Sequence, residues 1–306
     1  MTTATARKRG SADDAQVVAR RSKPGRRPRI GSYIFLGVLS LFFIFPLWWL
    51  VIASTKSNSG LFGGSAGTLW FDKQFNFFTN IAGLSSYMGG LYWRWMLNSL
   101  VYAVAGGFGA TILSVLGGYG FAKFRFRGRT AFLSAVLGAV MVPVTALTIP
   151  LFLLFSNFGL TNTVWAVILP SLLSPFGVYL MYVFCQDSVP NELLDAGRVD
   201  GAGEARIFFT IALPLMRPAV VTVLLLSVVH TWNQFFLPLV MLNDTKLLPV
   251  TVGLNLWQQQ AVGSNGIIQP WNLIVTGALV SVVPLIVSFL ALQRYWQGGL
   301  NLGSVK

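Results

Sequence analysis

Residues 218–242 read PAVVTVLLLSVVHTWNQFFLPLVML and contain no Asp, Glu, Lys or Arg. A helix needs about 20 consecutive apolar residues to cross the hydrocarbon core of a bilayer, and this run is long enough to do so. Inside lipid, only a helix satisfies all of its own backbone hydrogen bonds along one segment. The run therefore predicts a transmembrane helix.

Five further stretches are similarly apolar and long, namely residues 31–55, 97–122, 131–156, 164–185 and 272–293. The whole chain of 306 residues is 54% hydrophobic and 10% charged, whereas a soluble domain is typically about 25% charged. The alternative, buried helices of a large soluble protein, fails because too little polar chain remains to cover six such segments. The sequence therefore predicts an all-α membrane protein with six transmembrane helices.

The basic residues are distributed unevenly between the connecting segments. Residues 1–30 hold nine Lys or Arg and two Asp, which predicts a disordered basic cytoplasmic tail near anionic lipid. If the N-terminus is cytoplasmic, the inside segments carry 18 basic residues and the outside segments carry 4. Lys and Arg favour the cytoplasmic side, so both termini are predicted to lie in the cytoplasm. Because most of the net charge of +13 sits in the tail, nucleic acid is not an expected partner.

The sequence offers no basis for catalysis or for a bound cofactor. Cys185 is the single cysteine and His230 the single histidine, so no zinc or haem ligand set can be assembled. No Gly-Lys pair occurs, which excludes the phosphate-binding P-loop, so ATP-driven transport would need a separate ATPase subunit. We therefore expect no catalytic residue, no metal site and no enzyme activity.

The most polar segment at membrane depth lies inside the run 218–242. It contains His230 and Thr231, followed by Trp232, Asn233 and Gln234. An unpaired amide in hydrocarbon costs several kcal/mol, so these groups must face other helices or a wet cavity. They are candidates for a translocation path that meets a polar, uncharged solute, with Trp232 stacking on a sugar face. Hydrogen bonding between helices is the equally weighted alternative.

Small residues recur at every fourth position of the second stretch: Gly106, Ala110, Ser114, Gly118 and Ala122. On a helix they form one stripe that lets another backbone approach closely. Tight packing within the chain and a subunit interface are equally consistent with this stripe.

Residues 186–217 form the longest connection on the predicted cytoplasmic side, and they hold five of the nine acidic residues of the chain. Val189, Leu193, Ala196 and Val199 recur at helical spacing, while the charged residues fall on another face. Gly201 supplies a turn, and a second short helix runs from about residue 203 to residue 214. The pattern predicts a helix–turn–helix with a charged outer face.

The segment ELLDAGRVDGAGEARIFFTIALP, from Glu192 to Pro214, resembles the EAA loop of permease subunits of bacterial ABC importers. Asp195-Ala196-Gly197 takes the place of EAA, and Gly201, Ile211, Leu213 and Pro214 fall in register. Further segments are similar to the maltose-type carbohydrate importers: Asn98-Ser99, GYGFAKFRFRGR (118–129), IPLF (149–152), GLTNT (159–163), WNQFFLPL (232–239), LPVTVGL (248–254) and QRYWQGGLNLGSVK (293–306). The resemblance covers about residues 31–306 and fits the permease that lacks a large periplasmic insertion.

This resemblance implies a type I ABC importer core in the bacterial cell membrane, importing a sugar, namely a di- or oligosaccharide. It implies four partner chains: a second homologous permease, two cytoplasmic ATPase subunits and an extracytoplasmic solute-binding protein. The residues expected to couple this subunit to an ATPase are Glu192, Asp195, Ala196, Gly197, Arg198, Asp200 and Gly201. On the residues alone, a stand-alone secondary carrier or channel stays open. A third hypothesis, a membrane scaffold or receptor without transport, would leave the proline-containing spans and the central polar segment unexplained.

Overall fold

The computed structural model describes residues 30–63, 67–263 and 270–300, so the predicted basic tail up to residue 29 lies outside the described residues. The chain divides into two compact units, residues 1–48 and residues 49–306. Helix α1 (Ile30–Ser54) begins in the first unit and ends in the second. In the first unit, its apolar side chains, including Phe42 and Phe43, are exposed, as expected for a helix that faces lipid.

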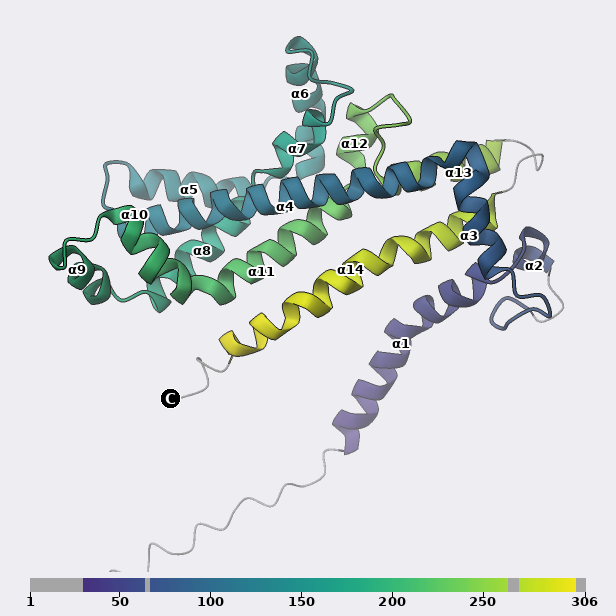
Figure 1. Ribbon diagram of the computed structural model, residues 1–306, viewed down its shortest axis with the longest axis horizontal. Coiled ribbons are helices and arrows are strands. Elements are labelled where there is room, and N and C mark those ends of the chain that lie inside the picture. The colour runs from purple at the N-terminus through teal and green to yellow at the C-terminus, as the bar shows by residue number, and fades with distance from the viewer. Residues whose placement is uncertain (1–29, 64–66, 264–269, 301–306) are drawn as a thin grey trace, which may run out of the picture. The chain divides into compact units, whose positions relative to one another are not determined.

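In the described ranges every regular element is a helix, which confirms the predicted all-α fold (Figure 1). The elements after α1 are α2 (Asn58–Gly63), α3 (Phe77–Ser86), η1 (Tyr87–Gly90), α4 (Leu91–Lys123), α5 (Arg129–Val140), α6 (Val144–Asn157), α7 (Trp165–Ser171), α8 (Pro175–Ser188), α9 (Asn191–Val199), α10 (Glu204–Ile207), η2 (Phe208–Ala212), α11 (Leu213–Trp232), α12 (Phe236–Met241), α13 (Val250–Gly263) and α14 (Trp271–Leu300).

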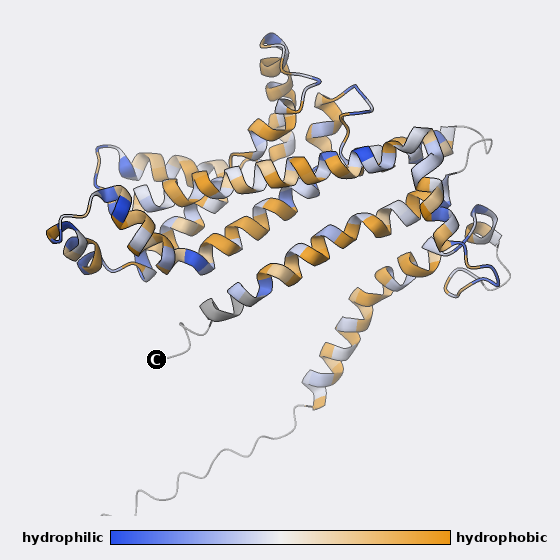
Figure 2. Cartoon of the chain, viewed as in Figure 1, coloured by the Kyte–Doolittle hydropathy of each residue, from blue (hydrophilic) through white to orange (hydrophobic). Residues whose placement is uncertain are grey.

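Five of the described helical segments are long and apolar enough to cross a membrane. They are Ile30–Ser54, Phe77–Lys123, Trp165–Ser188, Glu204–Trp232 and Trp271–Gln293, and the bent pair α5 and α6 makes a sixth if it counts as one span. Figure 2 shows apolar residues along most of the length of these helices. The chain is thus a multi-pass membrane protein by length and composition.

Three of the predicted stretches are not continuous helices. Residues 164–185 are divided between α7 and α8, with a break at residues 172–174. The two others break next to prolines. Residues 131–156 are divided between α5 and α6, which are bent by 103°. Residues 218–242 are divided between α11 and α12, with a break at residues 233–235. Proline explains both breaks, because its ring clashes with the carbonyl four residues earlier in a helix. Pro143 stands at the first break, and Pro238 would clash with the Gln234 carbonyl at the second.

Helix α4 packs along α8 and α11, and these three helices form the centre of the second unit (Figure 1). The small residues of α4 face these neighbours. A Cβ atom built on Gly118 would lie 2.4 Å from the Met181 Cβ atom and 2.7 Å from the Tyr182 nitrogen. A Cβ atom on Gly106 would lie 2.7 Å from the Ser171 Cβ atom. Of the two interpretations of the stripe, the structure shows tight packing within the chain.

Side chains near the start of α4 hold the segment that leads into α13. The Asn98 amide donates hydrogen bonds to the carbonyls of Lys246 and Leu248, at 2.8 and 2.9 Å. The Ser99 hydroxyl accepts a hydrogen bond from the Val250 backbone N–H at 2.8 Å. These bonds satisfy backbone groups that an irregular segment cannot pair by itself. They attach residues 246–250 to α4.

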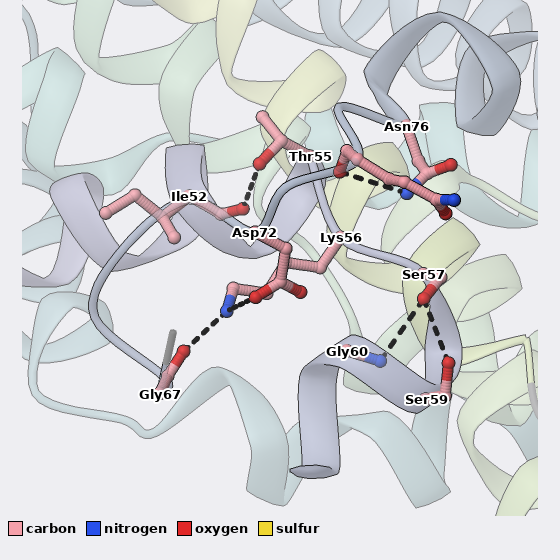
Figure 3. A network of polar contacts seen from close by, with 10 residues as sticks. Ile52, Thr55, Lys56, Ser57, Ser59, Gly60, Gly67, Asp72 and Asn76 are labelled. Atoms are coloured by element: carbon pink, nitrogen blue, oxygen red, sulfur yellow. Dashed lines mark hydrogen bonds and ion pairs between the residues drawn. The ribbon is translucent and has the colours of Figure 1, made fainter. Parts of the chain in front are cut away.

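A network of polar contacts holds the chain in place just after α1 (Figure 3). The Lys56 side chain is 1% exposed, and its ammonium lies 3.2 Å from the Asp72 Oδ1 atom. The same ammonium donates a hydrogen bond to the Gly67 carbonyl at 2.5 Å. The Asn80 amide donates to the carbonyls of Ser54 and Lys56, both at 2.9 Å. The buried charge is therefore paired, and residues 67–72 are held against the end of α1.

Replacing Asp72 with Asn should destabilise the folded protein at this polar network, because the Lys56 ammonium would remain buried without its counter-charge. Removing one partner of a fully buried ion pair costs about 3–5 kcal/mol, and the cost is smaller here because Asp72 is partly exposed. We expect a lower melting temperature in detergent for Asp72→Asn than for Lys73→Gln, which removes a neighbouring exposed charge. The double variant Lys56→Met with Asp72→Asn should recover part of the loss; no recovery would contradict the assignment.

Candidate coupling loop and solute path

The predicted helix–turn–helix is formed by α9 and α10, but its second helix does not end near Pro214. It continues through the π-helical turn η2 into α11 as one segment, Glu204–Trp232. Pro214 has no N–H group and cannot donate a backbone hydrogen bond to the preceding turn. The π-helical turn changes the hydrogen-bond pattern just before it, so the helix continues beyond the proline. Gly201 has φ of +79° between α9 and α10, the left-handed conformation that favours glycine. The second half of the loop is thus continuous with a candidate membrane span.

One face of α9 packs against the start of the next helical segment. Leu194 is buried, and Gly197 faces Ile207 and Ile211. A Cβ atom built on Gly197 would lie 3.2 Å from a side-chain carbon of each isoleucine. Glycine at the third position of the EAA-type motif therefore permits a close approach between the two helices.

The opposite, apolar face of α9 is exposed in the part of the chain that the structure describes, so the outer face predicted to be charged is also partly apolar. Leu193 is 45% exposed, Val199 is 88% exposed, and Ala196 between them is exposed. We call these three residues the outward face of α9. An exposed apolar surface rimmed by polar side chains is typical of a protein-binding site.

Charged residues surround this outward face and are partly paired within the chain. The Arg198 guanidinium lies 2.6 Å from the Asp195 Oδ1 atom and 2.7 Å from the Glu204 Oε1 atom. Hydrogen bonds to Glu204 and then to Asp195 raise the pKa of Arg198 above its usual value. These pairs are exposed and screened, so they orient the turn more than they stabilise it. Glu192 and Asp200 are also exposed.

The three residues proposed for a solute path have different environments. Trp232 is 4% exposed and packs in the hydrophobic core, so its ring does not reach an open path in this structure. Asn233 is exposed, and its amide donates to the Val229 carbonyl at 2.9 Å. The Gln234 carbonyl, freed by the break after α11, accepts a hydrogen bond from the Thr251 hydroxyl at 2.8 Å. The core position of Trp232 argues against its stacking on a sugar.

A cavity of about 380 Å³ lies beside this segment, one helical turn before the break. It is bordered by the bend between α5 and α6, by the start of α8, and by α11. Its polar lining residues are Ser171, Ser174, Ser227, His230 and Thr231, and the rest of its wall is apolar. The polar segment that begins at His230 indicated this position in the sequence. The isolated serines did not, because nothing in their local sequence distinguishes them from other serines.

Comparison with known proteins agrees with this architecture. Residues 110–300 match the family described as the binding-protein-dependent transport system inner membrane component. The chain is 32% identical to the arabinooligosaccharides transport system permease protein AraQ of Bacillus subtilis, over 91% of this chain and 96% of that protein. It is 33% identical to the lactose transport system permease protein LacG of Rhizobium radiobacter, over 92% of this chain and 97% of that protein.

Among solved structures, the chain resembles one from a bacterial ABC transporter involved in the import of the acidic polysaccharide alginate. The TM-score is 0.74 at 22% identity, and the match covers 95% of this chain and 100% of that chain. The fold is therefore that of an ABC importer membrane subunit. The chain belongs to the family of binding-protein-dependent transport system inner membrane components, which confirms the predicted family.

Proposed function

We propose that this chain forms half of the translocation path of an ATP-driven importer for a di- or oligosaccharide. Relatives named for the transport of arabinooligosaccharides and of lactose align with more than nine tenths of the chain and support a sugar substrate. The complete importer would contain a second homologous permease, two cytoplasmic ATPase subunits and an extracytoplasmic solute-binding protein. This chain supplies a membrane path and no ATP site of its own.

The outward face of α9 is the observation that carries the coupling part of this proposal. Val199, at 88% exposure, and Leu193 would be buried in a cleft of an ATPase subunit. Glu192, Asp195 and Asp200 would meet basic residues at the rim of that cleft. Since Asp195 already pairs with Arg198, docking exchanges or extends an existing ion pair instead of burying a lone carboxylate.

For the solute, the cavity beside α11 supplies hydroxyl and imidazole groups without a fixed charged residue in its wall. Such a lining suits a polar, uncharged ligand that donates and accepts hydrogen bonds. Asn233 and Gln234 remain candidates for the path beyond the cavity. We assign Trp232 to packing.

The orientation proposed here places both termini and α9 in the cytoplasm, on the strength of the asymmetry of Lys and Arg between the loops. A cysteine at Ser59, in a background in which Cys185 is serine, should react with a membrane-impermeant thiol reagent added to intact cells. A cysteine at Asp187 should react only after permeabilisation. The reverse pattern would overturn the orientation.

Uptake of labelled sugars by cells tests the substrate class. A strain that lacks this chain should lose accumulation of at least one sugar from a panel of labelled arabinooligosaccharides, lactose and other di- and oligosaccharides. The wild-type chain should restore that accumulation, and a control amino acid should be taken up equally by both strains. Unchanged accumulation of the whole panel in the deletion strain would contradict a sugar substrate of this class.

A further inference from the structure

We propose that Lys123 is a positioning residue of the coupling loop, which makes α9 move together with α4. This inference rests on the proposed function of α9 as the ATPase-binding helix. Lys123 is the last residue of α4, and it lies 66 residues before the junction that it contacts. Neither the EAA-like segment nor the charged pairs around Arg198 include it.

The contact joins α4 to the point where α8 gives way to α9. The Lys123 ammonium donates a hydrogen bond to the Val189 carbonyl at 2.6 Å and another to the Asn191 Oδ1 atom at 3.1 Å. Val189 follows the last residue of α8, and Asn191 is the first residue of α9. One cation therefore holds both sides of the hinge between the membrane span and the coupling helix.

The surroundings of the Lys123–Val189 hydrogen bond indicate that it is important for the junction between α8 and α9. Val189 is buried and extended, because the proline that follows it disfavours the helical conformation. Pro190 has no N–H group, so the hinge lacks one of the backbone donors that would otherwise stiffen it. A buried carbonyl that loses its hydrogen-bond partner is destabilising, because nothing then compensates for its removal from water. The ammonium also lies at the C-terminal end of α4, where the helix dipole favours a positive charge.

The position of α4 is itself fixed along its length, which makes it suitable as the element that Lys123 ties to the loop. Five residues before Lys123, Gly118 lets α4 touch the backbone of α8. At its other end, Asn98 and Ser99 hold the segment that leads into α13. A displacement of α4 is therefore passed to α9 through the Lys123 bonds, and a displacement of α9 is passed back.

The test compares Lys123→Met and Lys123→Arg in the complete importer, reconstituted in proteoliposomes with its binding protein. Methionine keeps the length and apolar stem of lysine but cannot donate a hydrogen bond, whereas arginine can. We expect Lys123→Met to retain the ATPase subunit and to hydrolyse ATP. The amount of sugar transported per ATP should fall about tenfold, which is the size of effect expected when one hydrogen bond to a charged group is lost. Lys123→Arg should restore most of that ratio, and Asn191→Ala should lower it less than Lys123→Met.

Three other results would overturn the inference. The first is a wild-type ratio of sugar to ATP in Lys123→Met. The second is a loss of the ratio that arginine does not restore. The third is a failure of Lys123→Met to assemble, with Lys123→Arg failing in the same way, because the residue would then serve only folding. Loss of the ATPase subunit from a Leu193→Asp complex tests the docking of α9 separately, so a failure of that proposal is distinguishable from a failure of this one.

Discussion

Replacing Leu193 with Asp should detach the ATPase subunit from this chain. Leu193 lies on the outward face of α9, and in the proposed complex its side chain is buried in the ATPase cleft. A carboxylate in place of a buried apolar side chain costs several kcal/mol unless a partner neutralises it, which corresponds to a loss of affinity of at least about a hundredfold. Because Leu193 is half exposed in the chain itself, the substitution should leave the fold of this subunit intact.

Purification through an affinity tag on this chain measures the effect. The ATPase should be recovered with the wild type and with Leu193→Met, and should be absent or strongly reduced with Leu193→Asp. Asp187→Asn, which changes an exposed residue in the last turn of α8, just before α9, is the matched control and should retain the ATPase. Full recovery of the ATPase with Leu193→Asp and normal ATP-driven uptake would exclude the outward face of α9 as the docking surface.

Gly118→Val should prevent the chain from folding in the membrane. A Cβ atom at this position would lie 2.7 Å from the backbone nitrogen of Tyr182, and the backbone cannot move aside as a flexible side chain can. Overpacking in a well-packed core typically costs about 1–3 kcal/mol, and a β-branched side chain against backbone atoms lies at or above the upper end of this range. The substitution separates α4 from α8 near the Lys123 hinge.

Gly120→Val is the matched control for this prediction, because a Cβ atom on Gly120 meets nothing within 4 Å. Both variants place valine on the same helix, two residues apart, so helix propensity and hydrophobicity change equally. Membrane-inserted protein, measured by fluorescence-detected size exclusion, should fall sharply for Gly118→Val and change little for Gly120→Val. Equal yields of the two variants would contradict the close packing of α4 on α8.

Apolar composition predicted the helical spans well, because the cost of an unpaired backbone group in lipid leaves few alternatives to a helix. The breaks within residues 131–156 and 218–242 were harder to predict, since Pro46 and Pro284 lie inside continuous helices α1 and α14. Whether a proline bends a helix or breaks it depends on its tertiary neighbours, which no local pattern contains.

The burial of individual residues in α9 was likewise only partly predictable from the sequence. Leu193 and Leu194 are adjacent and equally apolar, but only Leu194 packs against the chain. Helical spacing placed Val189, Leu193, Ala196 and Val199 on one face, but Val189 lies before α9 and is buried, whereas the other three are exposed. The burial of Leu194 and Gly197 depends on where Ile207 is placed by the turn at Gly201. Lys123 gave no signal because it lies far from the loop in sequence.

The burial of Trp232 could not be predicted, for a related reason. A large aromatic side chain next to two amides is compatible both with a sugar platform and with a core position, and the residues that enclose it come from distant helices. Its exposure could therefore not be predicted from residues 230–234 alone. The neighbouring Asn233 and Gln234 remain as predictions for the path.

We expect this chain to transport a solute only as part of an ATP-driven complex. The most direct measurement is uptake of a labelled oligosaccharide into proteoliposomes that contain the chain with its second permease and ATPase subunits, with ATP on the ATPase side and binding protein on the other. We expect accumulation above the external concentration that stops when ATP, the ATPase or the binding protein is omitted. Accumulation by this chain alone, driven by an ion gradient without ATP, would show that it is a stand-alone secondary carrier instead.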